Sequence, residues 1–281
     1  MSQSISIIIP AKNEHDGLEI ILPALCEMYG DAEIIVVDDG SSDGTAALCG
    51  GYPVKLVSHK YGMGNGAAIK SGAREAAGDL LVFMDADCQH RPEEIRLLVE
   101  RLREGYDMVV GARQANAHAG KARYLANALY NRFASWVTGH LVQDLTSGFR
   151  AVRADRFNQF LYMLPNGFSY PTTITMAMFR AGYSVTYVPV EVLARNGKSH
   201  IRPLMDGLRF LLIIFRVGTL YSPLKFFVPA SLLFFLTGLG YYAYTFLTQG
   251  RFTNMGTLLF IMAVLAFLIG LISEQLTMLL Y

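Results

Sequence analysis

The stretch LLVFMDADCQ, residues Leu80–Gln89, decides the fold class and locates a candidate site. Its first five residues are apolar and predict a buried β-strand, since such a strand is a short apolar run bounded by polar residues. Asp85 and Asp87 follow this run directly, and Gln89 comes two residues later. Carboxylate and amide oxygens are the ligands that Mg²⁺ and Mn²⁺ prefer in proteins. The stretch therefore predicts a metal site at the end of a strand.

The sequence on either side alternates between strand and helix patterns. Apolar runs predict further strands at residues 4–10, 33–37, 54–58 and 107–111, with Pro10 ending the first. Helical patterns lie between them, at residues 14–29, 45–49, 64–77 and 92–104. This order predicts an α/β fold, with a mostly parallel sheet covered by helices on both faces. Ligands bind such sheets beyond the carboxyl ends of the strands, where most acidic and small polar residues of this half occur.

The composition narrows the class of protein. The chain has 281 residues, of which 52% are hydrophobic and 17% charged. The apolar excess lies after about residue 204, and the part before it has the composition of a globular domain. A formal net charge of +1 gives no basic field, so we expect no nucleic-acid partner. Three widely spaced cysteines predict reduced thiols, and the N-terminus lacks a basic signal-peptide region, so we expect a cytoplasmic domain.

The C-terminal part predicts a membrane anchor. Residues 224–247 carry one charge, on Lys225, and residues 256–281 carry one, on Glu274. Each stretch is long enough, as a helix, to cross the hydrocarbon core of a bilayer. Basic residues cluster before the first span, so the positive-inside bias places the large domain in the cytoplasm and the short connector outside. We expect a multi-pass protein of a bacterial inner membrane or its equivalent, and its glycines permit close helix packing, within one chain or in a homo-oligomer.

The segment between these parts has its own pattern. Residues 200–222 place Arg202, Arg209 and Arg216 on one face of a helix beside apolar residues. This pattern is typical of a helix in the membrane interface, and a helix packed on the globular domain is the alternative. We therefore expect three parts, residues 1–199, 200–222 and 223–281.

Two loops add polar candidates at the sheet edge. Asp38 and Asp39 follow the second strand, where a carboxylate could accept hydrogen bonds from a base or ribose, or form a turn and cap. Gly62, Gly64 and Gly66 precede a helix and could let the backbone approach a nucleotide. Their spacing is not that of a dinucleotide fingerprint.

Four motifs in order carry a family resemblance. They are IIIPAKNE at 7–14, VVDDGSSDG at 36–44, DADCQ at 85–89 and DLTSGFRAVR at 144–153. Together they resemble the family 2 glycosyltransferases, which have a GT-A fold, and within them the dolichyl- and polyprenyl-phosphate mannosyl- and glucosyl-transferase branch. The resemblance covers about residues 4–200, and the tail resembles that of bacterial members with two C-terminal transmembrane helices.

The resemblance implies roles for particular residues. The nucleotide-sugar would be held by Pro10, Lys12, Glu14, Val37, Asp39, Gly66, Asp85 and Ala86. Asp87 and Gln89 would hold Mg²⁺ or Mn²⁺ at the diphosphate. The catalytic and phosphate-binding group would be Asp87, Arg113, Asp144, Ser147, Arg150, Arg195 and Ser199. Many relatives have an aromatic residue in place of Lys12 and a lysine in place of His200, so base stacking and one phosphate contact differ here.

The acceptor class has a physical argument beside the resemblance. A lipid phosphate has a second pKa of about 6, so it is already a nucleophile near pH 7 and needs cations rather than a strong base. A hydroxyl acceptor would need a base, and Asp144 is the candidate. The expected function is inverting transfer from a nucleotide-sugar, UDP-hexose rather than GDP-mannose, to a polyprenyl phosphate. The alternatives are transfer to another lipid or glycan hydroxyl, and a non-catalytic membrane scaffold.

One more helix bears on the acceptor. Residues 121–142 carry apolar residues at helical spacing, with Lys121, Arg123 and Arg132 beside them. The pattern predicts either a membrane-facing helix where a prenyl chain enters or a helix packed in the core.

Overall fold

The computed structural model describes residues 3–113, 121–167, 169–193 and 222–279, together with residues 212, 215, 218 and 219. Arg195, Ser199 and most of the segment expected to lie in the membrane interface are outside the described residues. The chain forms two compact units, residues 1–135 with 140–202, and residues 136–139 with 203–281.

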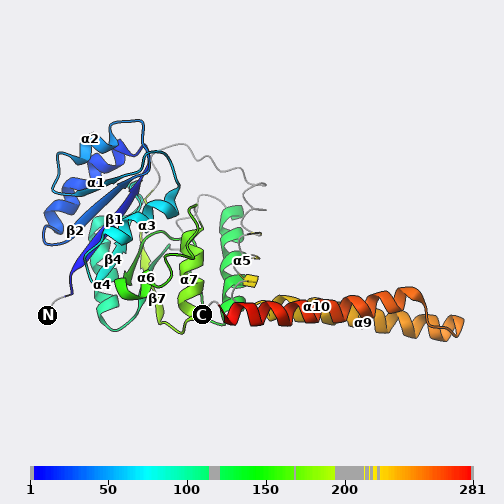
Figure 1. The fold of residues 1–281 in the computed structure, drawn as a ribbon. Helices are drawn as coiled ribbons and strands as arrows, with labels where there is room; N and C mark the ends of the chain where they lie inside the picture. Colours follow the sequence, from blue (N-terminus) through cyan, green and yellow to red (C-terminus); the bar gives the residue numbers. More distant parts are fainter. Residues whose placement is uncertain are drawn as a thin grey trace. The chain divides into compact units, whose positions relative to one another are not determined.

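The first unit is built on one mixed sheet (Figure 1). Its strands in chain order are β1 (Ile5–Ala11), β2 (Glu33–Asp38), β3 (Lys55–Ser58), β4 (Leu80–Phe83), β5 (Met108–Arg113), β6 (Arg150–Arg153) and β7 (Val185–Val190). Across the sheet they lie in the order β3-β2-β1-β4-β6-β5-β7. Only β6 is antiparallel to its neighbours, β4 and β5, among the strands described. The predicted mostly parallel sheet is confirmed.

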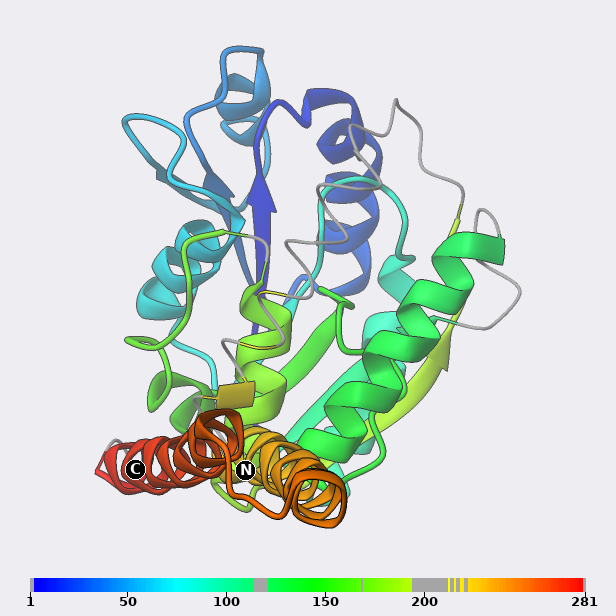
Figure 2. The same ribbon diagram turned by 90° about the vertical axis from the view of Figure 1, so that its right-hand side faces the viewer.

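Helices cover both faces of this sheet (Figure 2). They are α1 (His15–Met28), α2 (Thr45–Cys49), α3 (Asn65–Glu75), the 3₁₀ turn η1 (Pro92–Glu94), α4 (Ile95–Arg103), α5 (Lys121–Thr138), α6 (Ala154–Asn158) and α7 (Tyr170–Arg180). Ile7 and Ile9 of β1 join the apolar core beneath α1 and α4. Ile8 points to the opposite face, where a methyl group added at Gly72 of α3 would lie 2.4 Å from its side chain. This alternation, with a period of two, is what buries a strand on both faces.

Strand β1 continues one residue past Pro10, where we expected it to end. The carbonyl of Ile8 accepts from Met84 N, on the β4 side, and that of Ala11 accepts from Asp39 N, on the β2 side. By this alternation Pro10 faces the β4 side, and β4 pairs with β1 only as far as Phe83. The missing N–H of the proline therefore removes no hydrogen bond from the ladder.

The second unit contains the apolar C-terminal hairpin. Helices α9 (Leu224–Gln249) and α10 (Asn254–Met278) run side by side (Figure 1). Among the described residues these are the two helices long and apolar enough to cross a membrane. Only 6% and 17% of their most apolar windows are buried. A core helix of a soluble protein would bury most of such a surface, so this exposure fits a lipid environment.

Small residues seven positions apart bring the two helices together. The buried residues of α10 are Gly256, Ala263, Gly270 and Thr277. A repeat of seven keeps one narrow seam facing a partner helix, and small side chains let the backbones approach closely. A methyl group added at Gly270 would lie 2.5 Å from Cβ of Phe227 on α9, so the seam leaves no room there.

The two ionisable residues expected in the hairpin each lie at a helix end within the second unit. Lys225 Nζ donates to the carbonyls of Trp136, at 3.1 Å, and Val137, at 2.7 Å, in the last turn of α5. Glu274 Oε2 accepts from Leu224 N, at 3.4 Å, at the start of α9. A cation at a carbonyl end and an anion at an amino end both oppose the partial charges of helix termini.

Candidate active site

The candidate site lies at the carboxyl ends of the parallel strands. Because β6 runs in the opposite direction, the segment before it, residues 144–149, reaches the same edge as the loops after β4 and β5. A methyl group added at Gly148 would lie 2.7 Å from Oδ2 of Asp85. The fold therefore brings together the acidic motif of residues 85–89 and the motif of residues 144–153.

Asp85 and Asp87 fit a divalent-cation site that substrate oxygens would complete. Burial, and then the charge of Asp87, raise the pKa of Asp85 to about 6, although a hydrogen bond from Asn65 opposes the rise. A cation would relieve this repulsion between carboxylates. In the part of the chain that the structure describes, no three His, Cys, Asp or Glu side chains form a complete metal site. Two carboxylates with Gln89 and substrate oxygens are a common set for Mg²⁺.

The loop after β4 turns sharply to present these residues. Cys88 has a φ of +58°, in the left-handed region that non-glycine residues rarely adopt. The backbone N–H of Gln89 donates to Oδ1 of Asp87 at 3.2 Å, and its carbonyl accepts from Leu193 N at 3.0 Å. Ala86 is buried, and its carbonyl is so close to Gly17 of α1 that a methyl group there would lie 2.1 Å from it. The close packing of α1 thus holds the loop of residues 85–89 in place.

The residues expected at the nucleotide differ in exposure. Pro10 and Val37 are buried, and Glu14 is partly buried. Lys12 is exposed, and a methyl group added at Gly62 would lie 2.0 Å from its Nζ, so its ammonium lies over the loop of residues 60–64. Asp39 accepts hydrogen bonds from the backbone N–H groups of Met63 and Gly64 in that same loop.

Gly64 and Gly66, at the start of α3, have a packing role in this structure. A methyl group added at Gly66 would lie 2.0 Å from the carbonyl oxygen of Pro165, and one at Gly64 would lie 2.4 Å from that of Asn166. Ala67 N donates to the Asn166 carbonyl at 3.1 Å. The start of α3 is therefore covered by residues 165–167, so the glycines allow close approach of this chain's own backbone. The expected nucleotide contact of Gly66 stays a prediction.

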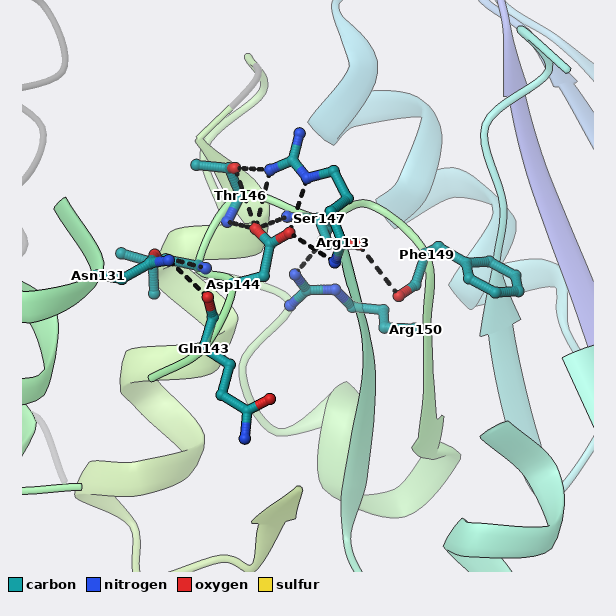
Figure 3. A network of polar contacts seen from close by, with 9 residues as sticks. Arg113, Asn131, Gln143, Asp144, Thr146, Ser147, Phe149 and Arg150 are labelled. Atoms are coloured by element: carbon teal, nitrogen blue, oxygen red, sulfur yellow. Dashed lines mark hydrogen bonds and ion pairs between the residues drawn. The ribbon is translucent and has the colours of Figure 1, made fainter. Parts of the chain in front are cut away.

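Arg113 and Asp144 form a forked ion pair (Figure 3). Arg113 Nε donates to Oδ2 of Asp144 at 2.7 Å, and Nη2 donates to Oδ1 at 2.9 Å. Asp144 also accepts from the backbone N–H groups of Thr146 and Ser147, each at 3.1 Å. Burial would raise the pKa of Asp144, but the hydrogen bonds and charge of Arg113 outweigh it and hold the pKa below its usual value. Asp144 is therefore an ionised partner for Arg113 and is poorly suited to act as a base.

Arg150, expected to bind phosphate, lies inside the protein. Its side chain is fully buried on the α7 face of the sheet, where Nη1 donates to the Pro171 carbonyl and to Thr175 Oγ1, both at 3.1 Å. Nη2 donates to the Ser147 carbonyl (Figure 3). Ser147 is buried too, and its hydroxyl donates to the Phe149 carbonyl at 3.4 Å. These contacts favour a role in shaping the loop of residues 144–149 over direct contact with a substrate.

A cavity of about 560 Å³ opens beside the Arg113–Asp144 pair. It is lined by Arg113, Asn127, Ala128, Asn131, Arg132, Ser135, Leu141, Val142, Gln143 and Asp144. The two faces of α5 differ in exposure, so core packing holds for one face and the membrane-facing role of the other stays a prediction. Tyr130 and Ala134 are buried in the core, whereas 69% of Leu129 is exposed.

Asn131 is a site residue that sequence reasoning missed. Its Nδ2 donates to the Gln143 carbonyl at 2.5 Å, and its Oδ1 accepts from Leu145 N at 3.1 Å (Figure 3). One amide therefore clamps the backbone on both sides of Asp144. The sequence offers no signal for this, because an asparagine in a helix is usually a surface residue.

Comparisons with known proteins agree with this geometry. Residues 6–161 match the model of glycosyl transferase family 2, and residues 222–279 match that of the GtrB C-terminal hairpin. The undecaprenyl-phosphate 4-deoxy-4-formamido-L-arabinose transferase of Enterobacter sp. (strain 638) is 39% identical over 161 residues, which are 53% of this chain and 48% of that protein. The chain thus spans about half the length of this relative. Glycosyltransferase AglJ of Haloferax volcanii is 25% identical over 255 residues, 88% of this chain and 83% of that one.

Solved structures share the fold. Glucosyl-3-phosphoglycerate synthase from Mycobacterium tuberculosis, in complex with Mn²⁺, uridine diphosphate and phosphoglyceric acid, superposes with a TM-score of 0.63 at 22% identity. The match covers 77% of this chain and 79% of that one. The same enzyme with Mg²⁺ and uridine diphosphate gives 0.62. The expected GT-A fold is confirmed, with two apolar helices after it. With the family model matching more than half of its length, the chain belongs to glycosyl transferase family 2.

Proposed function

We propose that this chain transfers a sugar from a nucleotide-sugar to a polyprenyl phosphate, with inversion at the anomeric carbon. The state of Asp144 carries the proposal. Its carboxylate is held by Arg113 and two backbone N–H groups, and its pKa is lowered, so it is a poor base for a hydroxyl acceptor. A phosphate acceptor needs no such base, because its second pKa of about 6 leaves it largely dianionic near pH 7.

Arg113 would bind that acceptor. Two of its side-chain nitrogens are used by Asp144, and among the described residues Nη1 has no hydrogen-bond partner. Arg113 and Arg132 both line the 560 Å³ cavity, which also has apolar walls at Ala128 and Leu141. A guanidinium binds phosphate oxygens well, and the apolar walls suit the first isoprene units. The relatives named as undecaprenyl-phosphate transferases support the same acceptor class.

The donor would lie beside the loop of residues 85–89. Asp87 and Gln89, beside Asp85, would hold Mg²⁺ or Mn²⁺, which when bound neutralises the leaving diphosphate. Solved neighbours that contain uridine diphosphate with either metal support this arrangement and favour a UDP-hexose over GDP-mannose. Asp85 and Asp87 would then bind the cation and would not act as a nucleophile. The lipid phosphate would therefore attack the anomeric carbon directly, opposite the leaving group, and one displacement inverts the configuration.

The membrane hairpin would keep the site near its lipid substrate. The apolar surfaces of α9 and α10 support a membrane location, and the basic residues before α9 favour a cytoplasmic catalytic domain. A cysteine introduced in the connector, at Gln249, should react with an impermeant thiol reagent from outside intact cells. Reaction only after the membrane is opened would reverse this topology.

A paired transfer assay tests the acceptor. Membranes containing the chain are given labelled UDP- and GDP-sugars with Mn²⁺ and either undecaprenyl phosphate or undecaprenol, which has the same chain but ends in a hydroxyl. We expect a labelled lipid only with the phosphate, and an α-linked donor should give a β-linked product. Faster transfer to undecaprenol would support the hydroxyl-acceptor alternative. Absence of transfer with every donor and acceptor would support a scaffold.

A further inference from the structure

Asp39 contacts His59, which in turn contacts Ser71, and neither the motifs nor the proposed reaction assigns a role to these two residues. Asp39 follows β2, and its Oδ1 lies 2.7 Å from Nδ1 of His59, which follows β3. The other ring nitrogen of His59 lies 2.8 Å from Oγ of Ser71 on α3. The side chains of His59 and Asp39 expose only 8% and 4% of their surface. Three elements of the fold thus meet in one buried hydrogen-bonded chain.

The direction of these hydrogen bonds follows from the charge on Asp39. Burial would raise the pKa of Asp39, but hydrogen bonds from His59 and from the backbone N–H groups of Met63 and Gly64 outweigh it and lower the pKa. An ionised carboxylate only accepts hydrogen bonds, so Nδ1 of His59 must carry a proton. In the neutral ring Nε2 is then an acceptor, and the hydroxyl of Ser71 donates to it.

The acceptor capacity of Asp39 is nearly filled by the protein. Oδ1 accepts from His59 and from Met63 N, at 2.7 Å each, and Oδ2 accepts from Gly64 N at 2.8 Å. A carboxylate oxygen accepts about two hydrogen bonds, so Oδ1 is full and Oδ2 has room for one more. Only 3% of Asp39 is exposed, so a ligand can reach one edge of it at most.

We infer that His59 and Ser71 are positioning residues that leave Asp39 one acceptor site, and that this site selects uracil over guanine in the donor. This inference rests on the proposed use of a nucleotide-sugar. Uracil presents one N–H between two carbonyls, which a single carboxylate oxygen satisfies. Guanine presents two adjacent donors, N1–H and the 2-amino group, which pair with both oxygens of a carboxylate. Here one guanine donor would stay unpaired on binding, and an unpaired buried donor costs affinity.

Calorimetric titration of the full-length chain in detergent, with Mn²⁺, tests the inference. UDP and GDP are the probes. We expect UDP to bind the unaltered protein at least about tenfold more tightly than GDP. His59→Ala should weaken UDP binding about tenfold and bring the two affinities closer, because the carboxylate is freed to turn. Ser71→Ala should have a smaller effect in the same direction.

Two further variants separate positioning from general loss of structure. His59→Asn keeps an N–H close to the position of Nδ1, so it should restore most of the UDP affinity and selectivity. Lys55→Ala removes an exposed side chain from β3 whose ion pair with Glu75 lies at the surface, so it is the matched control and should change nothing.

The outcomes distinguish this inference from the proposed function. Equal binding of UDP and GDP by the unaltered protein, or unchanged UDP affinity in both His59→Ala and Ser71→Ala, would overturn the inference. Selective UDP binding lost in His59→Ala but rescued in His59→Asn would uphold it, even if the paired assay shows no transfer to undecaprenyl phosphate. In that case the proposed acceptor would be wrong, and the proposed uracil-binding site at Asp39 would stand.

Discussion

Replacing Arg113 by lysine should weaken the use of polyprenyl phosphate while sparing the donor. In the structure Arg113 bonds Asp144 through Nε and Nη2, and Nη1 has no hydrogen-bond partner in the part of the chain that the structure describes, so we expect it to bind the acceptor phosphate. A lysine ammonium is a single centre. It cannot hold the carboxylate and reach the phosphate in this geometry, although it keeps the charge.

The expected rise in the KM for undecaprenyl phosphate follows from the loss of one hydrogen bond to its phosphate. A hydrogen bond between charged groups contributes about 1.5–3 kcal/mol, which corresponds to a change in affinity of about 10- to 140-fold. Because 29% of the Arg113 side chain is exposed, water screens part of this interaction, and the lower end of the range, about 10- to 30-fold, is expected. In the unfolded chain Asp144 has a pKa of about 3.9, and in the folded protein its pKa is lower. Its ion pair with Arg113 therefore contributes fully to stability above about pH 3.9 and is lost only as the pH falls through the folded pKa. The effect should therefore be the same at pH 6.5 and pH 8.

Initial rates at saturating donor give the KM for undecaprenyl phosphate, and rates at saturating lipid give the KM for the donor. Arg101→Lys is the matched control, since Arg101 also pairs with a carboxylate but lies at the surface of α4. An unchanged lipid KM in Arg113→Lys would refute the assignment of this residue to the acceptor. An equal rise in both KM values would show that the residue acts on the whole site rather than on the lipid phosphate.

Three further substitutions test the metal site, the sheet edge and the hairpin. Asp87→Ala should reduce turnover at least about 100-fold without loss of membrane insertion, and full activity of the unaltered protein in EDTA would contradict a metal role. Gly148→Ala places a methyl group 2.7 Å from Oδ2 of Asp85, so it should displace that carboxylate, raise the Mn²⁺ concentration needed for half-maximal rate and leave the lipid KM unchanged. Unaltered Mn²⁺ dependence would show that the loop can move to accept the methyl group without displacing Asp85. Gly270→Ala should lower the thermal midpoint in detergent because a methyl group there would overlap the facing helix, whereas Gly240→Ala, which has open space around it, should not. Equal midpoints for the two variants would count against the packed seam.

Local patterns in the sequence were sufficient for much of the fold. The first five strands and the helices between them could be predicted to within a few residues, because each is a run whose hydrophobic period matches its secondary structure. The hairpin could be predicted from length and apolar composition alone. The acidic residues after β4 could be placed at the ligand edge, since the direction of a parallel strand fixes which end its following loop occupies.

Strand β6 could not be predicted in this way. β6 has only four residues and begins and ends with arginine, so its sequence carries no apolar alternation. It is stable as a strand because β4 and β5 supply hydrogen bonds on both sides, which is a tertiary effect. The same position in the sheet turns the Arg150 side chain towards α7, where it is buried.

The family motifs, the α/β order and the apolar tail can be recognised in the sequence, because they depend on neighbouring residues and their spacing. Which polar groups face one another depends on the folded arrangement. Asp144 lies 31 positions from Arg113, and His59 lies 20 positions from Asp39. The sheet register and the packing of α3 and α5 bring these groups into contact, and no local pattern encodes either. The pairing decides the chemistry, because a carboxylate held by an arginine or a histidine has a different pKa and fewer free lone pairs than the same carboxylate in water.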